Sequence, residues 1–435
     1  MRRLKLILLS ILFVVASPSL AQPPANPAPV PATAQNPLNQ RARDVVSVLR
    51  GQGDLPSIFT AGFLAQVPAE QIAGVTQQLA AQCGTVRDVE SVAAASPTAG
   101  TVRFTFQRAI VIMSLQVEAQ APHRIAGLNV TGSEPIGGDS TETILGELRQ
   151  LPGQVNFQVA RLGDGAPTVV TQLEPDRPLA IGSSFKLLIL AELSRQVQAG
   201  QRRWSEVVPI DRHSLPSGIL QDWPLGSPVT VHTLASLMIS RSDNTATDVL
   251  LRLAGRENVE RMMTRMGLSQ AARNRPMLST IELFQLKANA EARTAWLAAD
   301  EAGRRRILRE QEADGGPAVE VSQLFATGPV AIDTVEWFAT AADMARVMDW
   351  LRVNADDTAK AVLAISPGMA RDAAGAFSYV GFKGGSEPGV INLTYLIRNN
   401  AGVWHVVTAG WNNPAALVDE AAFHALIVRA ARLVR

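Results

Sequence analysis

Gly182-Ser183-Ser184-Phe185-Lys186 is followed at once by the apolar run Leu187 to Ala191. This run predicts a helix that is buried almost all round and ends near Gly200. A lysine three positions after a serine lies on the same face of a helix. Because a serine hydroxyl is a weak nucleophile that needs an adjacent base, the pair predicts a reactive Ser183. The alternative is a serine that only caps the helix, with a lysine beside it by chance.

Lysine is rare in this chain, since five of the 435 residues are lysine and 35 are arginine. One of the five is Lys186, and another opens the stretch Lys383-Gly384-Gly385-Ser386. Arginine serves equally well on a solvated surface, but it does not lose its proton in a protein. A chain that otherwise uses arginine is expected to keep lysine where a compact or deprotonatable amine is needed.

A third motif, Ser242-Asp243-Asn244, lies between the two lysines. Ser-x-x-Lys, Ser-Asp-Asn and Lys-Thr-Gly, in this order, are the motifs of class A β-lactamases and penicillin-binding proteins. On these motifs residues 140–435 resemble that superfamily, with the class A type as the nearest pattern. The resemblance implies an α+β domain with an antiparallel sheet and a helical subdomain. Ser242-Asp243-Asn244 is also what the start of a helix at Thr245 would need as a cap.

The resemblance implies a role for each motif residue. Ser183 becomes acylated and Lys186 accepts its proton. Ser242 passes the proton to the leaving group, while Asn244 holds Lys186 and the substrate amide. Lys383 acts electrostatically on Ser242 and the substrate. The backbone N–H groups of Ser183 and Ser386 form the oxyanion hole, and Gly385 lets the acyl group approach the strand.

Two departures from the family pattern bear on the substrate and on turnover. The family has threonine or serine where this chain has Gly384, which puts strong carboxylate recognition in doubt unless Ser386 replaces that hydroxyl. The family's Glu-x-x-x-Asn loop is absent. Glu282 is the candidate deacylation base in its place, but Ser279-x-x-Glu282 is also a capping box, which we favour. Glu387 is a second candidate at the rim.

The N-terminus predicts export. Residues 1–21 combine a basic start, an apolar run too short to span a bilayer, and a small-x-small cleavage site at Ser19-Leu20-Ala21, which is typical of a signal peptide. Residues 22–37 are rich in Pro and Ala and predict an extended linker. The expected location is therefore periplasmic or secreted, with no stable membrane anchor.

Residues 38–134 predict a small α+β domain. Amphipathic helices are expected over 40–83, followed by β-type runs at Thr101–Phe106, Ala109–Leu115 and Ile125–Val130. The pattern resembles domains of the nuclear-transport-factor-2 and steroid-isomerase type. The pairing with a β-lactamase-like domain resembles a protein of clavulanic-acid biosynthesis clusters. Pro135 to Ser140 is the expected linker. Asp88 and Glu90 suggest solvated acids more than a catalytic pair.

Composition excludes several classes of partner and cofactor. Without residues 1–21 the chain has 37 basic and 39 acidic residues, so nothing favours nucleic acid as a partner. The five histidines have no metal-ligand spacing, and no metal or other cofactor is predicted. Cys83 is the only cysteine, lies in an apolar pattern, and is expected to be a buried thiol.

These features predict an exported serine hydrolase that acts on a small ester or amide, such as a β-lactam, through an acyl-Ser183 intermediate. We expect β-lactams to acylate it and to leave slowly. The alternatives are a true class A-type β-lactamase that uses Glu282, a D,D-peptidase, and a penicillin-binding sensor that is acylated without turnover. The insertion over about 290–330, which includes a predicted solvated helix at Glu301–Glu312, is a candidate lid.

Overall fold

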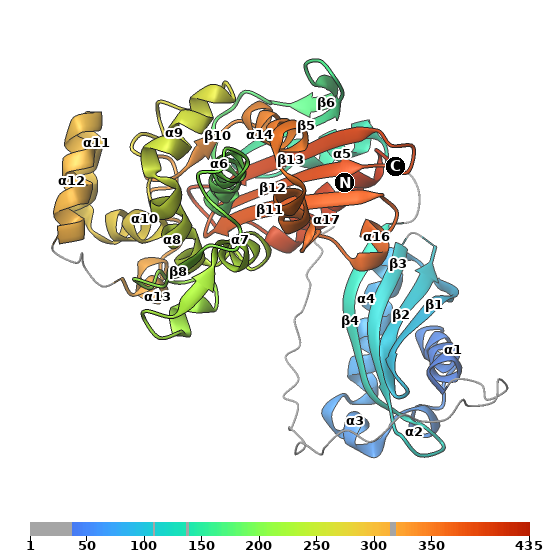
Figure 1. The fold of residues 1–435 in the computed structure, drawn as a ribbon. Coiled ribbons are helices and arrows are strands. Elements are labelled where there is room, and N and C mark those ends of the chain that lie inside the picture. The colour runs from blue at the N-terminus through green and yellow to red at the C-terminus, as the bar shows by residue number, and fades with distance from the viewer. Residues whose placement is uncertain (1–36, 108, 136–138, 314–318) are drawn as a thin grey trace. The chain divides into compact units, whose positions relative to one another are not determined.

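The computed structural model describes residues 37–107, 109–135, 139–313 and 319–435 (Figure 1). The predicted signal peptide, the linker up to residue 36 and part of the expected interdomain linker lie outside the described residues. The chain divides into two compact units between Gly138 and Asp139. Each unit is described by itself.

The first unit packs short helices against a four-stranded antiparallel sheet in the order β1-β2-β3-β4. Successive side chains of a strand point to opposite faces of the sheet. Alternate residues of β2 and β3, such as Phe104 and Met113, are accordingly buried on the face that packs against α1. The bounds are α1 Pro37–Leu49, α2 Leu55–Ile58, α3 Ala61–Gln66, α4 Ala69–Cys83, β1 Val86–Ser96, β2 Ala99–Phe106, β3 Ala109–Val117 and β4 Ile125–Pro135.

Three features of this unit concern the sequence-based expectations. The β-type runs predicted at 101–106, 109–115 and 125–130 lie inside β2, β3 and β4, and Cys83 is buried. Asp88 and Glu90 are both exposed on β1, and Glu90 pairs with Arg103 at 2.7 Å. The resemblance to the nuclear-transport-factor-2 type stays a prediction.

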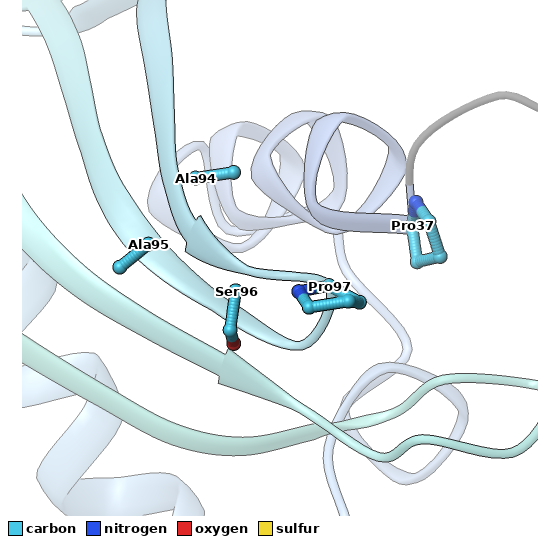
Figure 2. Close-up of a pocket in the computed structure, with 5 residues that line it drawn as sticks. All are labelled: Pro37, Ala94, Ala95, Ser96 and Pro97. Atoms are coloured by element: carbon cyan, nitrogen blue, oxygen red, sulfur yellow. The ribbon is translucent and has the colours of Figure 1, made fainter. Parts of the chain in front are cut away.

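A hollow lies at the β1–β2 turn beside the start of α1 (Figure 2). It is lined by Pro37, Ala94, Ala95, Ser96 and Pro97. No titratable side chain is among these residues, so the hollow has no group for acid–base chemistry.

The second unit is built on a five-stranded antiparallel sheet in the order β11-β12-β13-β5-β6, with β11 at the edge. Helices α5 and α17 cover one face, and α14 packs on the other (Figure 1). The antiparallel sheet that the resemblance implied for residues 140–435 is present. The bounds are β5 Gln154–Leu162, β6 Thr168–Leu173, β11 Tyr379–Glu387, β12 Val390–Arg398, β13 Trp404–Asn412, α5 Thr141–Arg149, α14 Ala341–Asn354 and α17 Glu420–Arg432.

A helical part contains the larger apolar core, with α6 at its centre. Its main helices are α6 Lys186–Gln198, α7 Val231–Ser240, α8 Asn244–Ala254, α9 Arg256–Arg265, α10 Thr280–Ala288 and α15 Asp357–Ala364. The remaining elements are short or lie in the insertion: β7 Leu179–Ala180, η1 Gly182–Phe185, β8 Val207–Pro209, η2 Leu220–Asp222, β9 Pro228–Thr230, α11 Ala290–Ala298, α12 Glu301–Ala313, α13 Val321–Leu324, β10 Phe338–Ala339 and α16 Arg371–Ala374.

The helix predicted to carry Ser183 needs one correction. Ser183 lies in the 3₁₀ turn η1, and the α-helix begins only at Lys186. The helix ends near Gly200, as predicted, and Gly200 has a φ of +69°, the left-handed conformation that ends many helices. The solvated helix expected over 301–312 is confirmed as α12. No helix among the described residues is long and apolar enough to cross a membrane.

Candidate active site

The turn that carries Ser183 is fixed from both sides. Ile181 N donates to Trp337 O at 2.9 Å, and the Phe185 ring stacks on the Trp337 ring with 3.8 Å between centroids and an interplanar angle of 8°. Ser184 N closes the turn on Ile181 O at 3.2 Å. Ser183 itself is only half-buried and lines a pocket. The turn therefore presents a serine hydroxyl from a rigid base.

Lys186 is fully buried, and its amine is surrounded by oxygen atoms. Nζ contacts Asn244 Oδ1 and the Ser242 carbonyl oxygen, both at 2.7 Å, and Ser242 Oγ at 3.1 Å. Burial and the nearby Lys383 lower the pKa of Lys186 well below its usual value, against the opposing effect of Asp248 and Asp243. The amine can therefore serve as a proton acceptor. Among the described residues no hydrogen bond joins it directly to Ser183 Oγ.

Ser242 lies between the two motif lysines. Its Oγ accepts from Lys383 Nζ at 3.2 Å as well as contacting Lys186. Ser242 has a φ of +54°, which is uncommon for a residue with a side chain and marks a constrained position. One hydroxyl is thus placed between two amines, which is the arrangement a proton shuttle needs.

Asp243 holds the turn beside Ser242 in place. Its carboxylate caps α8 by accepting from Ala246 N at 2.8 Å, and it also accepts from Ile219 N and Leu220 N. Ser242-Asp243-Asn244 therefore caps a helix and also places Ser242 and Asn244 beside Lys186. The interpretation as a helix cap and the interpretation as a catalytic motif are compatible.

Lys383 is also buried, on the edge strand β11. Besides Ser242 Oγ, its amine donates to the carbonyl oxygen of Gly384. Burial lowers the pKa of Lys383 to about 7. Its charge therefore changes close to neutral pH.

Two glycines bring β11 against the turn of Ser183. A Cβ on Gly385 would lie 2.4 Å from Ser183 N and 2.2 Å from Ile181 O, and one on Gly182 would lie 3.1 Å from Ser386 N. No side chain fits at Gly385. The backbone N–H groups of Ser183 and Ser386 are consequently neighbours, at the place where two donors can meet one oxyanion.

These residues surround one pocket of about 550 Å³. Five of the predicted site residues line it, and the two buried motif lysines are not among the lining residues. The lining residues are Ser183, Pro216, Ser217, Ser242, Asn244, Phe284, Gly384, Gly385, Ser386, Ile391, Leu393, Glu420, Ala421 and His424. Sequence reasoning missed the contribution of β12 and α17, because nothing local in those segments marks a pocket.

Glu282 does not line this pocket. It forms the capping box with Ser279 at the start of α10, and Arg256 binds both of its carboxylate oxygens at 2.7 and 2.8 Å. Arg256 and the hydrogen bonds from Ser279 lower the pKa of Glu282 despite its burial. This geometry favours the structural role over that of a deacylating base.

Glu387 is not at the rim. Its side chain is 7% exposed and forms an ion pair with Lys287, which also binds Glu336 at 2.7 Å. Burial and Glu336 raise the pKa of Glu387 well above its usual value. This buried cluster ties α10 to the end of β11 and was not predicted, because its members are far apart in the sequence.

Residues 140–352 match the model of a family described as the Beta-lactamase enzyme family. Similar solved structures include a β-lactamase from Sphaerobacter thermophilus DSM 20745 (20% identity, TM-score 0.47, 68% of this chain and 94% of that chain). A β-lactamase from Chitinophaga pinensis DSM 2588 has 16% identity and a TM-score of 0.48, over 68% and 98% of the two chains. The protein PBP-A has 15% identity and a TM-score of 0.45, over 68% and 93%. No curated protein matches the chain.

The family match covers both Ser183-x-x-Lys186 and Ser242-Asp243-Asn244. The strand with Lys383 follows in the chain and completes the same pocket. With its motifs in the family's order, this part of the chain is similar to the serine β-lactamases and penicillin-binding proteins.

Proposed function

We propose that the protein is an exported serine hydrolase that works by acyl transfer through an acyl-Ser183 intermediate. The placement of Ser242 Oγ between the buried amines of Lys186 and Lys383, at 3.1 and 3.2 Å, carries this proposal. Hydrolysis by one nucleophile needs a proton taken from the serine and returned to the leaving group. The contacts of Ser242 Oγ with Lys186 and Lys383 provide a path for this proton.

In the first step Ser183 Oγ attacks the substrate carbonyl carbon and its proton passes to the neutral Lys186 amine. The carbonyl oxygen becomes an oxyanion held by the N–H groups of Ser183 and Ser386. The bond to the leaving nitrogen or oxygen then breaks, and Ser242 Oγ gives that atom a proton while it receives one from Lys186. The product is an ester on Ser183 and a neutral leaving group.

In the second step water must attack the acyl ester, and a base must take a proton from that water. Among the described residues that line the pocket, Glu420 is the only carboxylate, and it belongs to α17 rather than to the turn or to α10. Glu282 is held by Arg256. We therefore propose that β-lactams acylate Ser183 and leave slowly. The same observation favours a penicillin-binding sensor as the second candidate.

Intact-mass spectrometry after mixing with a chromogenic cephalosporin tests both steps. We expect an adduct on Ser183 and a burst of product followed by slow turnover, since loss of a general base costs about 10²–10⁴ in rate. Ser183→Ala should abolish the adduct and the burst. An adduct retained on another serine would overturn the assignment. Rapid linear hydrolysis that Glu282→Gln abolishes would show a working β-lactamase instead.

A further inference from the structure

The pocket around Ser183 continues past the edge strand toward the C-terminal helix. Beyond Gly384 it is lined by Ile391 and Leu393 of β12 and by Glu420, Ala421 and His424 of α17. Gly384 pairs with Leu393 and Ser386 with Ile391 across the antiparallel strands. Paired residues project on the same face of a sheet. This part of the pocket, which we call the α17 subsite, therefore opens on the face that α17 covers.

Gly384 keeps this route open. A Cβ at Gly384 would lie 3.0 Å from Phe382 Cζ and 3.3 Å from Leu393 Cδ2. A hydroxyl-bearing side chain at this position would extend further into the same space. The glycine that replaces the family's threonine or serine therefore does more than remove a hydrogen-bonding group, because it gives access to the α17 subsite.

The position of Ser242 indicates which part of a substrate enters the α17 subsite. The carbonyl oxygen is held between the N–H groups of Ser183 and Ser386, and the leaving atom must face Ser242 Oγ. Ser242 Oγ accepts from Lys383 Nζ, and the same amine donates to the carbonyl oxygen of Gly384. Substituents of the leaving group therefore extend over Gly384.

The α17 subsite has no fixed cation for a negatively charged leaving group. Among the described residues that line the pocket there is no arginine and no lysine. The Lys383 amine lies behind it, is already engaged with Ser242 Oγ and the Gly384 carbonyl oxygen, and has its pKa lowered to about 7 by burial. The exposed Glu420 adds a negative charge at the rim. His424 Nε2 already lies within hydrogen-bond distance of the Gly368 carbonyl oxygen and the Tyr395 hydroxyl. A carboxylate placed on Ile391 and Leu393 would therefore lose water without gaining a lysine or arginine as its partner.

We propose that the α17 subsite accepts an uncharged, apolar leaving group, so that the protein prefers neutral esters and amides to substrates whose leaving group carries a carboxylate. This inference rests on the proposed acyl transfer and adds the substrate class.

A matched pair of probes tests it on the full chain: benzylpenicillin, which has a carboxylate on the leaving-group side, and its methyl ester, which does not. The second-order rate constant of acylation by each probe is measured by intact mass after quenching. Each rate constant is then divided by the rate constant for the reaction of the same probe with hydroxide, which corrects for the difference in chemical reactivity. We expect the ester to be at least about tenfold faster after this correction, since an unpaired buried charge costs more than the 1.4 kcal/mol of a tenfold effect.

Two variants locate the effect. Gly384→Ser should remove most of the preference by slowing the ester more than the acid. Glu420→Gln, at an exposed position, should speed the acid by roughly two- to fivefold relative to the ester, because exposed charge pairs contribute up to about 1 kcal/mol. The control Glu310→Gln, on the exposed face of α12, should change neither rate.

The outcomes separate the inference from the function on which it rests. Faster acylation by the free acid overturns the subsite and leaves the acyl transfer intact. An ester preference that Gly384→Ser and Glu420→Gln leave unchanged also overturns the subsite. No adduct with either probe overturns both proposals.

Discussion

At the scale of the residue, the proposed acyl transfer requires an amine rather than a permanent cation at Lys186. A guanidinium keeps the positive charge but does not accept a proton from Ser183. We expect Lys186→Arg to lose acylation almost as completely as Lys186→Ala, by about 10²-fold or more. Acylation rates of folded variants, with circular dichroism as the control, measure this. Near-normal rates in the arginine variant would show that Lys186 acts by charge alone.

The lowered pKa of Lys186 also affects stability. The unfolded chain binds a proton on this lysine up to its usual pKa of 10.5, while the folded chain has released it at lower pH. Stability therefore rises with pH in this window. Relative to Lys186→Met, we expect the unfolding free energy of the wild type to gain up to about 1.4 kcal/mol per pH unit as the pH rises toward the usual pKa of lysine. Denaturant titrations at several pH values measure the difference, and a flat difference would contradict a neutral Lys186.

Lys383 gives acylation a pH limit of its own. Its amine places a positive charge beside Ser242 Oγ only while it is protonated, and its pKa is about 7. We expect the rate of acylation to fall as the pH rises through this value, and Lys383→Arg to move the fall to higher pH. Rates between pH 5.5 and 9 show the profile. A rate that is constant over this range would contradict a role for the charge of Lys383.

The motif lysines were predictable from the sequence because residue type, order and spacing all mark them. The role of Lys287 was not predictable, although it is also one of the five lysines of the chain. Its carboxylate partners, Glu336 and Glu387, are 49 and 100 positions away, and only the folded chain brings the three together. Rarity of a residue type therefore indicated burial better than it indicated catalysis.

At the scale of the element, the contact between β11 and η1 depends on a missing side chain. Gly385→Ala would place a Cβ within 2.4 Å of two backbone atoms, so we expect loss of acylation and lower stability. Gly146→Ala in α5 is the matched control, because a Cβ there meets nothing within 4 Å. It should raise stability by up to about 1 kcal/mol and leave acylation unchanged. Thermal unfolding and labelling compare the two, and normal labelling of Gly385→Ala would contradict the close approach.

Elements with a regular apolar pattern were predictable, whereas others depended on tertiary context. The alternation in β2 follows from one buried face, whereas β12 and β13 are buried on both faces and are mostly apolar throughout. By contrast, β1 is mostly exposed, so its residues carry no clear period. The turn η1 has the composition of a helix start, but its close contact with β11 and its stacking on Trp337 favour a tighter turn.

At the scale of the whole molecule, the predicted site residues all belong to the second unit. We expect residues 139–435 to fold and to be acylated without the first unit, because the hydrophobic clusters of the second unit contain none of the first unit's residues. The rate of acylation and the unfolding transition of this fragment are compared with those of the full chain. A fragment that folds but is not labelled would show that the first unit contributes to the site.

The placement of α17 has a consequence for how this protein can evolve. The helix forms one wall of the pocket with side chains that lie on its exposed turns, such as Glu420 and Ala421, while Phe423 and Ile427 hold it to the sheet. Mutations at the wall positions alter the shape and charge that a substrate meets and leave the amines around Ser242 untouched. Selection can therefore change the range of substrates separately from the proposed reaction chemistry. New specificities can arise through mutations in α17 while Ser183 is kept.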